Sequence, residues 1–204
     1  MKLFSRIISD IFTPLLAPTY GIVIALWLSV FYYVLPLGTR LTVVLTVFGM
    51  TFILPFILIA ALHNFKFIED KRLRKRNERF IPYGFIVACY IGTACYLSHI
   101  HAQQWIIVAM GAASVSAILC LIINLWWKVS AHCCGIGGLL ALTWAMNDLQ
   151  LGVTNLFPVL LAMIFLCGLV GTARLALERQ SILQVLVGFV IGFTIESTPM
   201  MVLF

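Results

Sequence analysis

Three residues with chemically useful side chains, Lys128, Ser130 and His132, lie at alternate positions just before a glycine-rich apolar segment. They offer an ammonium group, a hydroxyl group and an imidazole ring. The segment that follows is expected to be a helix, and the free backbone N–H groups and dipole at a helix N-terminus favour an anion. The pattern therefore predicts an anion-binding site here. The alternative for His132 is a structural or solvated position near a membrane surface.

A second basic segment, residues 69–82, contains a dense run of cations that includes Arg72 and Arg79. Such a run commonly determines membrane topology or contacts anionic lipid headgroups, and each cation near the surface contributes roughly 1 kcal/mol. Arg79 differs from the rest because it lies beside Pro82, where an apolar helix is expected to begin. Its guanidinium group could point into a helix bundle and bind an anion there.

A third segment pairs Arg174 with Glu178, and Gln180 with Gln184, each at a spacing of four residues. If this stretch is helical, the members of each pair share a helix face. The glycines that follow at 188 and 192 form a pattern that permits close packing of two helices. Packing alone is a sufficient explanation for those glycines.

Composition sets the class of protein that must position these residues. Of the 204 residues, 63% are hydrophobic and 10% are charged, and the net charge is +6. There is too little polar surface to cover a water-soluble globule of this length. We expect an all-α, polytopic membrane helix bundle that forms a single domain over residues 1–204.

Seven apolar runs are long enough to be considered as membrane spans. The fifth is short and rich in glycine, so a tilted, re-entrant or buried segment, and a count of six spans, remain open. The expected spans are residues 15–36, 41–63, 81–98, 104–127, 133–148, 154–173 and 182–203.

This arrangement places all but one of the 13 Lys and Arg residues on one side of the membrane, with Arg40 on the other. By the positive-inside rule the basic side is expected to face the cytoplasm, and the protein to reside in the inner membrane of a cell. Residues 1–12 are expected to form a retained interfacial amphipathic helix with Ser5 and Ser9 on its polar side; a cleaved signal peptide is the alternative. The six cysteines have no CxxC spacing and suit apolar packing, so no metal or cofactor is expected.

The order of the three segments resembles the membrane type 2 phosphatidic acid phosphatase family. Its motifs are Lys-x6-Arg-Pro, Pro-Ser-Gly-His and Ser-Arg-x5-His-x3-Asp. The second motif is similar to residues 129–132, and the third is similar to residues 173–184 with a continuing likeness over 185–189. For the first motif, Arg72 and Arg79 have the right separation, but Pro82 comes three positions late. The resemblance covers residues 64–192.

The resemblance implies roles for the matching positions. Phosphate would be bound by Arg72, Arg79, Ser130 and Arg174, beside Lys128. His132 would protonate the leaving group. In an alternative, His132 or Cys133 would act as the nucleophile. Two positions depart from the family: Gln180 stands in place of the nucleophilic His, and Gln184 in place of the Asp that orients it. An amide has no useful nucleophilic lone pair and does not take up a proton as imidazole does.

Two functions of different class follow from this pattern. One is a lipid-phosphate phosphatase acting on a phosphatidate or polyprenyl phosphate by an altered mechanism, and the other is a non-catalytic protein that binds, transports or senses such lipids. A purely structural helix bundle ranks third. The expected partners are membrane lipids and a lipid phosphate, with no nucleic acid. Glu196 is a separate candidate, because an ionisable residue at membrane depth is commonly functional, although it could instead lie near the far interface.

Overall fold

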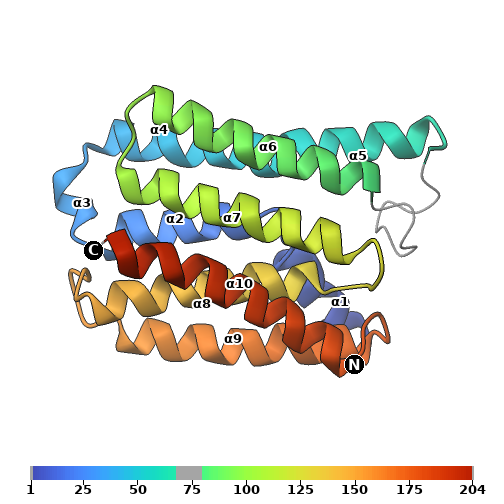
Figure 1. The fold of residues 1–204 in the computed structure, drawn as a ribbon. Coiled ribbons are helices and arrows are strands. Elements are labelled where there is room, and N and C mark those ends of the chain that lie inside the picture. The colour runs from blue at the N-terminus through green and yellow to red at the C-terminus, as the bar shows by residue number, and fades with distance from the viewer. Residues whose placement is uncertain (1, 68–79, 204) are drawn as a thin grey trace.

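The computed structural model describes residues 2–67 and 80–203 of the chain, and in that part the protein is an all-helical bundle whose long helices run roughly parallel (Figure 1). Arg72 and Arg79 lie outside the described residues. In chain order the elements are α1 (Lys2–Ile11), α2 (Ala17–Leu28), α3 (Phe31–Val34), α4 (Leu37–Phe48), η1 (Gly49–Ile53), α5 (Leu54–Asn64), α6 (Phe80–His99), α7 (Gln104–Ile123), α8 (Ala131–Asp148), α9 (Phe157–Ala176) and α10 (Ile182–Leu203).

Five of these stretches are long and apolar enough to cross a membrane: the continuous helix Leu37–Asn64, and the helices α6, α7, α9 and α10. They correspond to the expected spans 41–63, 81–98, 104–127, 154–173 and 182–203. Helices are favoured there because a backbone in lipid must satisfy its N–H and C=O groups internally. The expectation of an integral membrane helix bundle is supported at this level.

The first expected span, residues 15–36, is not one helix. Helix α2 has 12 residues, which corresponds to about 18 Å of helix length. It ends at Leu28 because the backbone turns away to pair with the loop between α8 and α9: Val30 N donates to Leu151 O at 2.8 Å, and Val153 N donates to Leu28 O at 3.1 Å. The Ser29 hydroxyl group also donates to the Ala25 carbonyl at this end. These tertiary hydrogen bonds have no signature in local hydropathy.

The helix that spans Leu37–Asn64 contains one turn of π-helix, η1, immediately before Pro55. Proline lacks a backbone N–H, and its ring clashes with the carbonyl group four residues earlier in a regular α-helix. The wider π turn removes that clash, so the helix continues through the proline.

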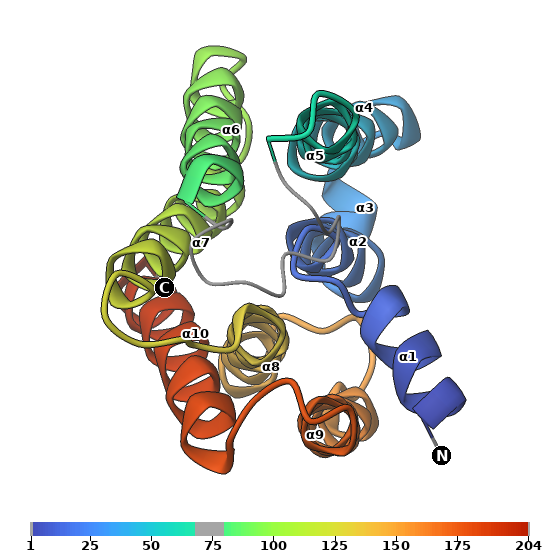
Figure 2. The same cartoon turned by 90° about the vertical axis from the view of Figure 1, so that its right-hand side faces the viewer.

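Helix α8 lies at the centre of the bundle, surrounded by α2, α7, α9 and α10 (Figure 2). Its closest neighbour is α10, and glycines make this approach possible. A Cβ atom on Gly192 would collide with the Cys134 carbonyl, and one on Gly137 would lie 2.6 Å from the Phe189 carbonyl oxygen. The close packing predicted from the glycine spacing is therefore present, and it explains why the short fifth segment is buried by its neighbours.

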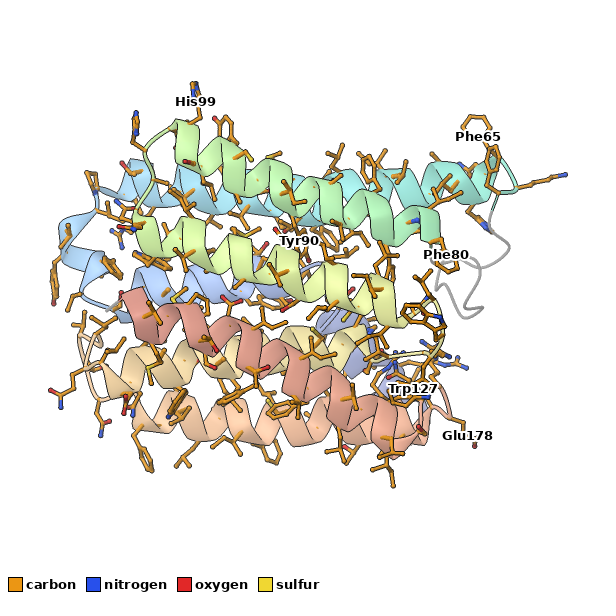
Figure 3. All side chains as sticks on the ribbon, viewed as in Figure 1. Phe65, Phe80, Tyr90, His99, Trp127 and Glu178 are labelled. Atoms are coloured by element: carbon orange, nitrogen blue, oxygen red, sulfur yellow. The ribbon has the colours of Figure 1, made fainter. Side chains whose placement is uncertain are left out.

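The connections between helices divide between the two ends of the bundle as expected. Phe65, Phe80, Trp127 and Glu178 lie at one end, and His99 lies at the other (Figure 3). We call the first end, formed by α1 and the described residues of the α5–α6, α7–α8 and α9–α10 connections, the basic end. Arg40 lies in the first turn of α4 at the opposite end, buried against the rings of Trp27 and Tyr32.

Candidate functional site

Arg174 is the central cation of the basic end. It lies in the last turn of α9 and is only 4% exposed. Its Nε donates to Gln180 Oε1 at 3.2 Å, and one terminal nitrogen donates to Ser9 Oγ at 2.8 Å. Sequence reasoning assigned Arg174 and Gln180 to one site, and the structure brings their side chains into direct contact.

His132 approaches Ser9 of α1 as well, from helix α8. It lies in the first turn of α8, and its Nε2 is 3.1 Å from the Ser9 carbonyl oxygen. A carbonyl oxygen only accepts hydrogen bonds, so Nε2 is the donating nitrogen in this contact. Arg174 and His132 therefore direct N–H groups at the two oxygen atoms of a single serine.

Ser9 is the residue of this site that sequence reasoning missed. It was assigned to the polar side of an interfacial helix, and α1 is indeed helical there. However, the two serines face the protein: Ser5 and Ser9 are buried, whereas Leu3 and Phe4 are exposed. The available signal was the i, i+4 spacing of two small hydroxyl residues beside Ile8, which also packs into the bundle.

Gln180 is held by both of its amide atoms. While Oε1 accepts from Arg174, Nε2 donates to the Val129 carbonyl at 3.3 Å. The amide therefore links the end of α9 to the residue before the α8 cap. In this position Gln180 orients the Arg174 guanidinium group, which is a positioning role and not a nucleophilic one.

The expectation that Gln180 and Gln184 share a helix face is wrong, because α9 ends before them. Glu178 adopts a left-handed conformation with φ of 53°. Glu178 N donates to Leu175 O at 2.8 Å and Arg179 N to Arg174 O at 3.4 Å, a pattern that terminates a helix. Glu178 therefore lies beyond α9, and Gln180 lies in the turn that precedes α10.

Gln184 instead caps α10. Its Oε1 accepts from Ser181 N at 3.1 Å, and the Ser181 hydroxyl accepts from Gln184 N at 3.4 Å. This reciprocal pair is a capping box, which satisfies backbone donors at a helix N-terminus. The side chain of Gln184 thus serves its own helix, while its carbonyl group accepts from Ser130 N at 3.2 Å.

Ser130 and Lys128 anchor the α7–α8 connection. Ser130 is fully buried, and its hydroxyl group caps α8 by accepting from Cys133 N at 3.3 Å. Lys128 Nζ donates to the Arg179 carbonyl at 2.8 Å, which ties this connection to the α9–α10 turn. These two residues lie beside the Arg174 and His132 contacts.

The arrangement brings hydrogen-bond donors from α8 and α9 together at Ser9 of α1. Arg174 supplies a planar set of cationic donors, and His132 supplies one more donor from a second helix. In the part of the chain that the structure describes, no group of three or more His, Cys, Asp or Glu residues could hold a metal ion. The side chains of Arg174 and His132 are of types suited to hydrogen bonding and charge pairing with an anion, and an imidazole can also donate a proton.

The fold and this site together define an integral membrane helix bundle with a cationic site at one end. Comparisons with protein-family models, curated proteins and solved structures found no match. The function is therefore argued from the residues of the site.

Proposed function

We propose that the protein binds the phosphate headgroup of a membrane lipid, of the phosphatidate or polyprenyl phosphate type, at the basic end of the bundle. The observation that carries this proposal is the convergence of Arg174 and His132 on the two oxygens of Ser9. Those oxygens mark positions at which phosphate oxygens would meet the same donors. Hydrogen bonds from charged donors to a phosphate oxygen are roughly twice as strong as neutral ones, so a phosphate would compete well with the serine.

The position of the site suits a lipid ligand. Apolar helices extend from the basic end through the bundle, so a headgroup at this end would leave its chains in the hydrocarbon layer. We further propose that α8, and the segment that contains α2 and α3, cross the membrane with the five longer helices, which gives seven crossings. In this arrangement the basic end faces the cytoplasm, following the positive-inside rule.

Gln180 favours binding over turnover. Both atoms of its amide are engaged, and neither can attack phosphorus in the way an imidazole does. Hydrolysis of the bound lipid is the second candidate, in a divergent phosphatidic acid phosphatase-like enzyme. The contact of His132 with Ser9, to which Arg174 also bonds, favours hydrolysis. An imidazole beside a bound phosphate is suited to proton donation.

Binding is tested with the full-length protein reconstituted in phosphatidylcholine nanodiscs that contain defined amounts of phosphatidate. We expect Arg174→Gln to weaken phosphatidate binding at least tenfold, since it removes the cationic donors. Arg40→Gln is the matched control, a buried arginine at the opposite end, and it should bind as the wild type does. Equal binding by the wild type and Arg174→Gln would refute the proposal.

Hydrolysis is tested separately by phosphate release from the same nanodiscs. Activity in the wild type that disappears in His132→Ala would establish the enzyme. If the wild type binds phosphatidate but releases no phosphate, the double variant Gln180→His with Gln184→Asp tests whether an imidazole at this position produces turnover. Positioned acid–base groups typically contribute about 10²- to 10⁴-fold. No release from any of these proteins would leave the non-catalytic binding function.

A further inference from the structure

A second site lies inside the bundle, on the face of α8 that turns away from α1. It is a cavity of about 120 Å³ lined by α2, α6, α7, α8 and α10. Ala131, in the first turn of α8, lines it near the basic end, and Leu142 lines it more deeply. Most of the wall is apolar, with Ile22, Met110 and Leu142 among its residues.

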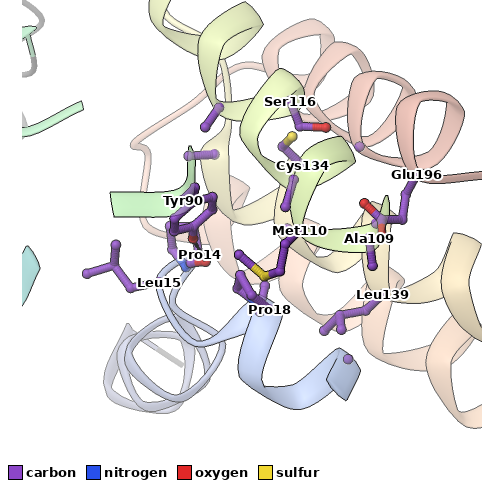
Figure 4. Close-up of a pocket in the computed structure, with 18 of the residues that line it drawn as sticks. Pro14, Leu15, Pro18, Tyr90, Ala109, Met110, Ser116, Cys134, Leu139 and Glu196 are labelled. Carbon is purple, nitrogen blue, oxygen red and sulfur yellow. Dashed lines mark hydrogen bonds between the residues drawn. The ribbon is translucent and has the colours of Figure 1, made fainter. Parts of the chain in front are cut away.

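Glu196 projects into this cavity from α10. The residue is 7% exposed, and Figure 4 shows its carboxyl group directed toward Ala109 and Met110. None of the described residues donates a hydrogen bond or forms an ion pair with that carboxyl group. Two tyrosines, Tyr83 and Tyr90, also line the wall, and Tyr90 donates its hydroxyl proton to the Pro14 carbonyl at 3.0 Å. Among the described lining residues, Glu196 is the one acidic group that the cavity offers to a ligand.

We propose that this cavity binds a small lipophilic amine whose ammonium group pairs with Glu196. A buried acid without a partner is unfavourable, and an opposite charge with good hydrogen-bond geometry compensates for it. No Lys, Arg or His occurs among the described residues of the wall, and the proposal therefore assigns the cation to the ligand. A bare metal ion is disfavoured because the wall is apolar and lacks a set of oxygen ligands.

The size of the cavity defines the apolar part of the ligand. An engineered apolar cavity of about 150 Å³ in another protein binds benzene. A volume of about 120 Å³ therefore suits a single aromatic ring or a short alkyl chain. This inference does not depend on the lipid-phosphate proposal, because Arg174 and His132 contact α1 and are not among the residues of the cavity wall.

The test uses the full-length protein in detergent micelles and equilibrium dialysis with radiolabelled benzylamine and toluene. We expect the wild type to bind benzylamine saturably, and Glu196→Gln to bind it at least tenfold more weakly while binding toluene as the wild type does. Glu178→Gln is the control, because it removes an exposed acid in the α9–α10 turn. Retained toluene binding shows that the cavity is intact in the Gln variant.

Two results would overturn the proposal. One is benzylamine binding that is the same in the wild type and Glu196→Gln, which would assign it to the micelle or to another site. The other is a wild type that binds neither probe saturably. A second variant, Gly138→Ala, checks the location, because its added methyl carbon would contact the side chain of Glu196 at 3.9 Å. It should weaken benzylamine binding, and unchanged binding would place the ligand elsewhere.

Discussion

Replacing Ser9 with alanine tests the core of the anion-site argument. The change removes the acceptor of the 2.8 Å hydrogen bond from Arg174 but leaves the backbone carbonyl that faces His132. Hydrogen bonds to charged groups contribute about 1.5–3 kcal/mol to stability. A phosphate must break this bond in order to reach Arg174, so its removal should increase phosphate affinity while the unliganded protein loses stability.

The two effects are linked in magnitude. Since about 1.4 kcal/mol corresponds to a tenfold change in an equilibrium constant, the expected gain in phosphatidate affinity is roughly 10- to 100-fold. Affinity is measured in phosphatidylcholine nanodiscs with phosphatidate as the probe, and stability by SDS titration of the unliganded protein. Thr172→Ala is the control, because the Thr172 hydroxyl is exposed and donates to Gly168 and Leu169 of its own helix.

A less stable Ser9→Ala protein with unchanged phosphatidate affinity would refute the reasoning. That result would mean that the Arg174 donor released by the substitution does not face the ligand. A gain in affinity that is matched by Thr172→Ala would also refute it, because the gain would then follow from general loosening of α9.

Three further predictions concern the bundle itself. Gly192→Leu should destabilise the protein by more than about 3 kcal/mol in SDS titration, because its side chain would displace the Cys134 carbonyl in a well-packed contact; a near-native stability would contradict the close α8–α10 packing. Ser130→Ala should cost about 1 kcal/mol through loss of the α8 cap, measured in the same way. With an impermeant thiol reagent added outside intact cells, Gly38→Cys should react and Glu178→Cys should not, and the reverse pattern would invert the proposed orientation.

Hydropathy was sufficient to predict the long helices, because in lipid each backbone must satisfy its hydrogen bonds within the helix. The expected span 182–203 coincides with α10. The first expected span is not one continuous helix, for a tertiary reason: α2 stops at Leu28, where the chain bonds to the residues around Leu151. A loop more than a hundred residues away in the sequence decides where this helix ends, and single-segment patterns cannot carry that information.

In the candidate site, too, some features could be predicted from the sequence and others could not. The sequence grouped Arg174, His132 and Gln180 by residue type and by the sidedness of the charge, and the structure places these side chains near one another at the basic end. The spacing of Gln180 and Gln184 would put them on one helix face only in a continuous helix, and no glycine marks the end of α9 to show that the helix stops before them. The left-handed residue there is Glu178, a residue type that rarely adopts this conformation, so the usual signal of a helix terminus was absent.

The packing of the helices indicates which part must move when an anion binds. Gly188 and Gly192 bring α10 into backbone contact with α8, where an added Cβ would collide with the carbonyls of Ser130 and Cys134, so α8 cannot shift along α10 without repacking both helices. Helix α1 packs against α9 and exposes Leu3 and Phe4 on its outer side. Its contacts are therefore the ones that an incoming phosphate can replace. Under the binding proposal, the donors of Arg174 and His132 would stay fixed to the bundle, while Ser9, carried by a helix with an exposed apolar face, would be the acceptor that leaves.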